Sequence, residues 1–140
     1  MSAKILVVED EQDMTELLAC NLKGRGYEVL TAVNGLEALN QARRHLPDLI
    51  LLDLMLEGID GYSVCEILRR QPSTASVPVI MVTALAGQIA RMNGMASGAT
   101  DFITKPFSLE DLMARIHHVL EAQAEAMRRL NAGSESSPEA

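Results

Sequence analysis

The sequence predicts an α/β fold in which helices cover both faces of a five-stranded, doubly wound parallel sheet. Short apolar runs rich in Val, Ile and Leu alternate with segments of helical periodicity. Continuous apolar runs are typical of strands buried on both faces, and their alternation with helices favours right-handed βαβ units. The chain has 140 residues and is 48% hydrophobic, which predicts one domain with a core of its own.

The five expected strands are the apolar runs themselves. The third run is the most apolar, which places it near the centre of the sheet. The runs cover residues 4–8, 28–32, 49–53, 79–83 and 102–104.

The expected helices lie between these strands. The first covers residues 13–24, where apolar residues recur at helical spacing and Gly24 and Gly26 end the pattern. The second begins at 34–35 and ends before Pro47, because proline disfavours helical backbone in the residue before it. The third opens at Gly61, and the fourth covers residues 87–96 with a weaker pattern.

The last helix carries a stripe that continues beyond the expected body. Its members follow 4,3 spacing, which predicts a coiled-coil-like extension: Leu109, Met113, Ile116, Leu120, Gln123, Met127 and Leu130. We therefore divide the chain into a body at 1–122, a helical extension at 123–131 and a small, polar, flexible tail or linker at 132–140. A natural end and a cut before an effector domain both remain open.

Charge and hydropathy exclude some partners. The formal net charge is −7 and the isoelectric point is near 4.9, so the field of this chain opposes direct binding to nucleic acid or to an anionic membrane. No apolar stretch is long enough to span a bilayer, and no signal-peptide pattern precedes the first strand. We expect a cytoplasmic protein without membrane contact.

Four of the expected strands end on residues that can carry chemistry. Glu9 and Asp10 follow the first, Asp53 ends the third, Thr83 ends the fourth and Lys105 follows the fifth. Because ligands of open α/β sheets bind at the carboxyl ends of the strands, we expect these side chains to converge. Carboxylates held close together repel one another unless a cation neutralises them. The set indicates a divalent metal and a phosphate.

The motifs around these residues resemble those of bacterial response-regulator receiver domains. They are Val-Val-Glu-Asp-Glu at 7–11, Leu-Leu-Asp-Leu-Met at 51–55, Val-Thr-Ala at 82–84 and Gly-Ala-Thr-Asp-Phe-Ile-Thr-Lys-Pro-Phe at 98–107. The resemblance runs in order from about Lys4 to Leu120. It implies a flavodoxin-like fold of the chemotaxis-receiver type with strand order 2-1-3-4-5.

The resemblance also implies roles for the acidic residues. Asp53 matches the phospho-acceptor, whose carboxylate oxygen attacks phosphorus. Glu9 and Asp10, with Asp53 and the backbone carbonyl of Met55, match the ligands of a magnesium ion, a hard cation that prefers oxygen donors. Lys105 matches the amine that contacts the phosphate, and in the family the peptide bond after it is cis.

A switch and an output face follow from the same resemblance. Thr83 would donate to the phosphate, and with Phe102 it matches a pair whose movement changes the face made by the fourth helix, fifth strand and fifth helix. Charged residues that receivers of transcription factors use for dimerisation also have matches, at Arg91, Asp101 and Arg115. Solvated helix charges are an equally good interpretation of those three.

Three positions bear on the lifetime of the phosphate. Glu57 stands where receivers commonly have proline, so the loop loses a fixed φ and gains a charge near the metal. Met55 and Leu85 occupy two variable positions that influence access of the hydrolytic water, and neither side chain can orient water. We expect slow autodephosphorylation.

The expected function is that of a two-component receiver. A sensor histidine kinase or phosphotransfer protein would supply the phosphoryl group, and a downstream effector, with a phosphorylation-dependent homodimer as a further expectation, would receive the signal. Such a chain is a signalling protein with magnesium-dependent self-phosphorylation rather than a dedicated enzyme. The cognate kinase and the output pathway cannot be derived from the residues.

Three alternatives stay open. The chain would also suit an N-terminal fragment of a DNA-binding or enzymatic regulator, or a protein-binding module that no longer depends on phosphate. A hydrolase of the haloacid dehalogenase type shares the aspartyl nucleophile and magnesium. Such enzymes normally carry a second Asp two residues after the nucleophile, and Met55 in that place argues against one.

Overall fold

The computed structural model describes residues 2–85 and 87–135 and contains one parallel sheet of five strands. Their order is β2-β1-β3-β4-β5, which confirms the predicted topology. The third strand ends one residue earlier than predicted and the fifth begins one residue earlier. The strands are β1 (Lys4–Val8), β2 (Glu28–Ala32), β3 (Leu49–Leu52), β4 (Val79–Thr83) and β5 (Asp101–Thr104).

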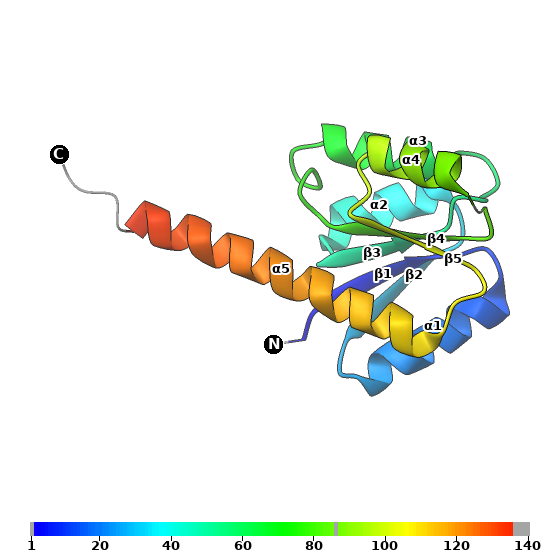
Figure 1. The fold of residues 1–140 in the computed structure, drawn as a ribbon, viewed down its shortest axis with the longest axis horizontal. Coiled ribbons are helices and arrows are strands. Elements are labelled where there is room, and N and C mark those ends of the chain that lie inside the picture. The colour runs from blue at the N-terminus through cyan, green and yellow to red at the C-terminus, as the bar shows by residue number, and fades with distance from the viewer. Residues whose placement is uncertain (1, 86, 136–140) are drawn as a thin grey trace.

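Five helices connect and follow the strands, close to where the sequence predicts them. They are α1 (Gln12–Gly24), α2 (Gly35–His45), α3 (Gly61–Arg70), α4 (Gln88–Ala96) and α5 (Leu109–Glu135). The helices form two layers: α1 and α5 cover one face of the sheet, and α2, α3 and α4 cover the other (Figure 1).

The two faces of the sheet explain why the central strands are apolar throughout. Leu6 and Ile50 pack toward α2 and α3, whereas their neighbours Ile5 and Leu51 pack toward α1 and α5. All four are at most 1% exposed. Successive side chains of a strand point to opposite faces, so a strand covered on both sides requires apolar residues at every position.

The register of the central strands places the functional residues at one level. Val8 pairs with Leu52 at the ends of β1 and β3, and the backbone N–H of Asp53 donates to the carbonyl of Val8 at 3.1 Å. Glu9 and Asp53, the next residue in each segment, therefore leave the sheet side by side.

Helix α5 is longer than predicted. It runs 27 residues, to Glu135, whereas the sequence analysis ended it at Asn131 and placed 132–135 in the tail. Once a helix exists, each further residue that is fixed adds one hydrogen bond, so the polar composition of this stretch does not end it. The predicted tail beyond Glu135 lies outside the described residues.

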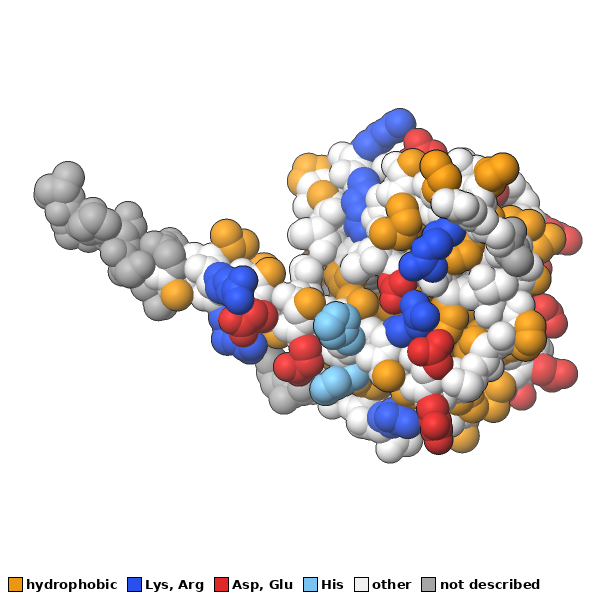
Figure 2. Space-filling model, viewed as in Figure 1, with side chains coloured by type: hydrophobic (Ala, Val, Ile, Leu, Met, Phe, Trp, Pro, Cys, Tyr) orange, Lys and Arg blue, Asp and Glu red, His pale blue; other side chains and the backbone are white. Residues whose placement is uncertain are grey.

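The second half of α5 projects away from the domain (Figure 1). Acidic and basic side chains lie close together on this projecting part (Figure 2). No helix among the described residues is long and apolar enough to cross a membrane.

Candidate functional site at the carboxyl edge of the sheet

The structure brings the residues that follow β1, β3 and β5 into direct contact. The Lys105 ammonium donates to both carboxylate oxygens of Glu9, at 3.2 and 3.1 Å, and to Oδ2 of Asp53 at 3.2 Å. The three side chains are only 14%, 3% and 6% exposed, respectively. Lys105 is thus the counter-ion of two buried carboxylates that come from two different strands.

Asp10 completes a cluster of three acids. Carboxylate oxygens of Glu9, Asp10 and Asp53 all lie within 4.8 Å of one another, with Asp10 exposed and the other two buried. Hard oxygen donors at such spacing, open to solvent on one side, fit a magnesium ion that keeps several of its waters. The donor set therefore fits the metal that the sequence motifs imply.

The electrostatics of the cluster favour an additional cation. The pKa of Glu9 is raised from 4.5 to about 7, chiefly by burial and further by a hydrogen bond and charge repulsion from Asp53, while Lys105 opposes the rise. Burial lowers the pKa of Lys105, but the charges of Asp53 and Glu9 outweigh it and hold that pKa above its usual 10.5. One ammonium does not fully compensate two buried carboxylates and a third nearby.

The loop after β3 fixes the orientation of Asp53. Its Oδ1 accepts a hydrogen bond from the backbone N–H of Met55 at 3.0 Å, while Oδ2 binds Lys105. Gly61 at the start of α3 packs directly below, where a Cβ would lie 2.7 Å from the Asp53 carbonyl oxygen and 2.7 Å from the Leu54 Cα. A glycine is required there because any larger residue would push the loop away from the sheet.

Thr83 and Phe102 are both buried, at 0% and 2% exposure. The Thr83 hydroxyl accepts from the backbone N–H of Leu85 at 3.2 Å, rather than contacting Asp53. The ring of Phe102 packs against α4, where a Cβ at Gly94 would lie 3.0 Å from the ring. Of the predicted switch pair, Phe102 thus contacts α4, and Thr83 lies at the carboxyl end of β4.

The three charged residues predicted on the output face meet within one chain. Arg115 donates to both carboxylate oxygens of Asp101 at 3.1 Å, and Arg91 lies 4.0 Å from the same carboxylate. Arg91 also donates to the carbonyl of Phe102 at 3.2 Å. The cluster therefore joins α4, β5 and α5.

The three positions that the sequence predicts to affect phosphate lifetime lie at the rim of the site. The side chains of Met55 and Leu85 are 56% and 38% exposed. Glu57 is exposed and lines a cavity of about 580 Å³ together with Asp10, Leu36 and other residues of the adjacent loops.

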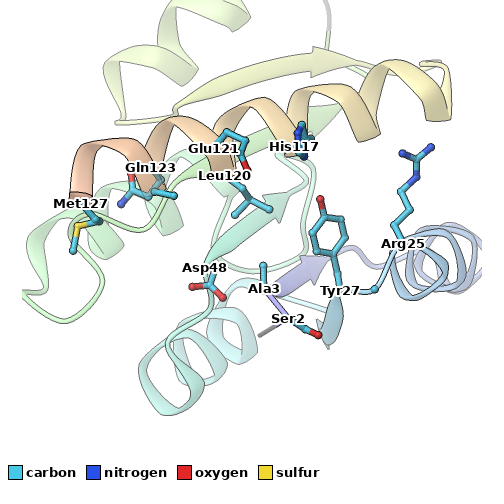
Figure 3. Close-up of a pocket in the computed structure, with 12 residues that line it drawn as sticks. Ser2, Ala3, Arg25, Tyr27, Asp48, His117, Leu120, Glu121, Gln123 and Met127 are labelled. Atoms are coloured by element: carbon cyan, nitrogen blue, oxygen red, sulfur yellow. The ribbon is translucent and has the colours of Figure 1, made fainter. Parts of the chain in front are cut away.

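Sequence reasoning missed two features. The hydroxyl of Tyr62 donates to the carbonyl of Ala90 at 3.1 Å and ties α3 to α4; the only signal was an aromatic residue with a polar end at a helix start. A second cavity, of about 730 Å³, lies at the opposite edge of the sheet, where Leu120 points from α5 into the space beside Ala3 and Tyr27 (Figure 3). No motif marks it.

The family model of the response regulator receiver domain matches residues 5–117. Response regulator PleD of Caulobacter vibrioides is 48% identical over 116 residues, covering 83% of this chain and 26% of PleD. Phosphate regulon transcriptional regulatory protein PhoB of Rhizobium meliloti is 45% identical over 120 residues, covering 86% of this chain and 53% of PhoB. The chain thus spans between a quarter and about half of these relatives.

Solved structures agree. Chemotaxis protein CheY4 of Vibrio cholerae superposes with a TM-score of 0.81 at 31% identity, over 85% of this chain and 99% of that one. The receiver domain of the Francisella response regulator 1452 superposes with a TM-score of 0.82 at 30% identity, over 87% of this chain and 99% of that one. The acidic edge, the strand order and these matches lead to one conclusion: the chain belongs to the response regulator receiver domains of two-component systems.

Proposed function

We propose that this receiver accepts a phosphoryl group on Asp53 from a phosphohistidine of a sensor kinase or phosphotransfer protein, with magnesium as cofactor. The observation that carries the proposal is the environment of the Asp53 carboxylate. It is buried, its Oδ1 is held by the Met55 N–H and its Oδ2 by Lys105, and two further carboxylates lie within metal-binding distance. A carboxylate that only stabilised the fold would not be expected beside two further carboxylates.

The reaction is a phosphoryl transfer between side chains. An Asp53 carboxylate oxygen attacks phosphorus, the bond between phosphorus and the histidine nitrogen breaks, and that nitrogen leaves with the electron pair. Glu9, Asp10, Asp53 and the backbone carbonyl of Met55 would hold magnesium, which offsets the charge on the phosphoryl oxygens when bound. Lys105 places a second positive charge beside the same oxygens, which favours the transfer electrostatically.

The signal would then pass through Thr83 and Phe102. A hydroxyl can accept one hydrogen bond and donate another, so Thr83 can accept from the Leu85 N–H and donate to a phosphate oxygen. Movement of this strand end reaches α4 through the Phe102 ring, which packs on Gly94. We infer that α4, β5 and α5 form the output surface.

That surface would bind a downstream effector or a second phosphorylated copy. Arg91 and Arg115 could pair with Asp101 of a second copy in place of their own Asp101. This exchange would bury no additional charge. Several matched relatives are named as transcriptional regulators, and one matched over 84% of this chain is a DNA-binding master regulator of Synechocystis. With a net charge of −7, any nucleic-acid contact would belong to another domain or protein.

The test is intact mass after incubation with magnesium and acetyl phosphate, in which acetate is the leaving group. We expect one phosphoryl adduct on the wild type and on Asp48→Asn, the same substitution at the opposite edge of the sheet. The adduct should be absent from Asp53→Asn, and from the wild type in EDTA.

Two results would contradict the proposal. An adduct on Asp53→Asn would move the acceptor to another residue. No adduct on the wild type, with beryllofluoride also leaving the amide spectrum unchanged, would favour a binding module that no longer depends on phosphate.

A further inference from the structure

Helix α4 buries fewer residues than its neighbour α3. All nine residues of α4 are described, and of these only Gly94 is buried and Ala90 half-buried. A glycine inside a helix also lowers the intrinsic stability of that helix. Helix α3 has 10 residues and buries Gly61, Val64, Cys65 and Leu68. The position of α4 therefore depends on a small number of contacts with the rest of the domain.

The carboxyl-terminal end of α4 is held firmly. The Arg69 guanidinium, from α3, donates to the carbonyl of Gly98 at 3.0 Å and to the carbonyl of Val77 at 2.7 Å. The backbone N–H of Gly98 donates to the carbonyl of Met95 at 3.1 Å and closes the helix end. Gly98 has a φ of +109°, and a Cβ there would lie 2.8 Å from Cγ of Arg69. This end is suited to act as the fixed point of α4.

The first turn of α4 is held less firmly. The helix begins after Gly87, which has no side chain to cap it. Arg91 reaches the carbonyl of Phe102 at 3.2 Å, but its side chain is 53% exposed, so water competes for this contact. The half-buried contact is the hydrogen bond from the Tyr62 hydroxyl to the carbonyl of Ala90, at 3.1 Å. Tyr62 is thus the main polar tie between the first turn of α4 and the body.

Tyr62 itself stands on the loop that carries Asp53. The preceding residue, Gly61, donates its backbone N–H to the carbonyl of Leu54 at 3.2 Å and packs against the Asp53 carbonyl. Asp60 caps the start of α3 by accepting from the Ser63 N–H at 3.0 Å. The Tyr62 hydroxyl therefore joins a firmly held helix start beside the acidic cluster to the loosely held start of α4.

We propose that the Tyr62 hydroxyl is a latch, which holds the first turn of α4 in the observed position and must release Ala90 when phosphorylation moves that turn. In this position the Thr83 hydroxyl accepts from the Leu85 N–H, and α4 begins shortly afterwards, at Gln88. A strand end that shifts toward the phosphate pulls on the first turn, while Arg69 keeps the far end in place. This inference rests on the proposed phosphorylation of Asp53.

The latch sets how readily the receiver responds. A ligand shifts a conformational equilibrium only against the contacts that hold the first conformation, so removing one hydrogen bond from that conformation favours the other. A single hydrogen bond contributes a few-fold to about tenfold in such an equilibrium, which is within the usual range of coupling between sites. Tyr62 is therefore a positioning residue for α4, and its hydroxyl opposes the response to phosphorylation.

The first test is a titration of the full 140-residue chain with beryllofluoride in the presence of magnesium, followed in the amide spectrum. Tyr62→Phe removes the hydroxyl and keeps the ring, so we expect the apparent dissociation constant to fall about fivefold. Tyr27→Phe is the matched control, because Tyr27 is the other of the two tyrosines and lines the cavity at the opposite edge of the sheet. It should bind with the wild-type constant.

An unchanged dissociation constant for Tyr62→Phe would overturn the proposal, because a purely structural contact is present in both conformations. A raised constant would also overturn it and assign the hydrogen bond to the phosphorylated conformation. An equal fall for Tyr27→Phe would mean that the effect does not come from the contact with Ala90.

The second test is hydrogen exchange without magnesium or beryllofluoride, which probes the latch independently of phosphorylation. The Arg91 amide donates to the Gly87 carbonyl at 3.2 Å in the first turn, and the Gly98 amide reports the far end. In Tyr62→Phe we expect exchange about fivefold faster at Arg91 and unchanged at Gly98. Equal exchange at Arg91 in the wild type and the variant would mean that Tyr62 does not hold the first turn.

The two tests separate the latch from the function on which it rests. A wild type that ignores beryllofluoride would contradict phosphorylation of Asp53 and, with it, the role of the latch in signalling. In that case faster exchange at Arg91 in Tyr62→Phe would still establish the mechanical role of the hydroxyl, and equal exchange would remove that role as well.

Discussion

The carboxyl edge of the sheet buries charged side chains, whereas the projecting half of α5 exposes apolar ones. Glu9 and Asp53 are 3% and 5% exposed, while Met127 and Leu130 are 50% and 68% exposed. Both regions depart from the usual distribution of residues, in opposite directions. The first is balanced inside the chain by Lys105, and the second has no such balance among the described residues. Buried charge requires a compensating partner close by, whereas single exposed apolar side chains do not.

The largest effect should come from removing the ammonium group that neutralises the buried carboxylates at the carboxyl edge. Lys105→Met leaves Glu9 and Asp53 buried without their counter-ion. We expect a loss of about 3 kcal/mol in the free energy of unfolding at pH 8, measured by urea denaturation without magnesium. The loss should shrink at pH 6, where Glu9 takes up a proton.

Lys23→Met at the exposed end of α1 is the control and should cost less than about 1 kcal/mol. Equal losses for the two variants would mean that the buried carboxylates do not depend on Lys105.

The raised pKa of Glu9 makes the free energy of unfolding depend on pH. The folded state holds the Glu9 proton up to about pH 7 and the unfolded state only to about 4.5, so the folded state binds more protons between these values. The free energy of unfolding therefore falls as pH rises through this window, by on the order of 3 kcal/mol from this group.

Glu9→Gln cannot titrate, so the difference between wild type and variant isolates the effect. Saturating magnesium should flatten the wild-type curve, because a bound cation favours the ionised carboxylate. Parallel curves for wild type and Glu9→Gln would place the pKa of Glu9 near its usual value.

Autodephosphorylation at the same edge should depend on the exposed side chains at the rim of the site. Met55→Asn with Leu85→Glu supplies groups that can orient a water beside the phosphorylated Asp53, where the native side chains cannot. We expect autodephosphorylation to accelerate about tenfold, which corresponds to the gain of roughly one hydrogen bond in the transition state. The half-life of the phosphorylated form by intact mass measures it. Met92→Asn on α4 is the control, and an unchanged half-life in the double variant would remove Met55 and Leu85 from the mechanism.

The sequence predicts the carboxyl edge well because the continuous apolar runs show where the strands end. Asp53 and Lys105 each follow an apolar run, and parallel strands bring such ends to one edge. The apolar runs do not specify which side chains meet there. That Lys105 binds both oxygens of Glu9 as well as Asp53, across 96 residues, depends on side-chain packing that no local pattern encodes.

The sequence predicts α5 less completely for the same reason. The 4,3 stripe indicates one apolar face but gives no point at which the sheet stops covering it. Gln123 is a polar residue within the apolar stripe, and in the structure it lies where α5 contacts the loop at Ser76. The cavity beside it is built from the chain start, the α1–β2 turn and α5, which are distant in sequence.

The smallest effect should come from the exposed half of α5. Leu112→Ala and Leu130→Ala change the same residue type on the same helix, but Leu112 is 0% exposed and Leu130 is 68% exposed. We expect Leu112→Ala to lower the free energy of unfolding by about 2–5 kcal/mol and Leu130→Ala by less than about 0.5 kcal/mol. Thermal and urea unfolding measure both.

The two variants separate the half of α5 that packs on the sheet from the half that projects. Leu112 belongs to the buried core between the sheet and α5, whereas every side chain from Glu125 to Ala132 is exposed, so only Leu112→Ala removes buried contacts. A large loss for Leu130→Ala would mean that Leu130 packs against its own domain, and the contrast between the two regions would disappear.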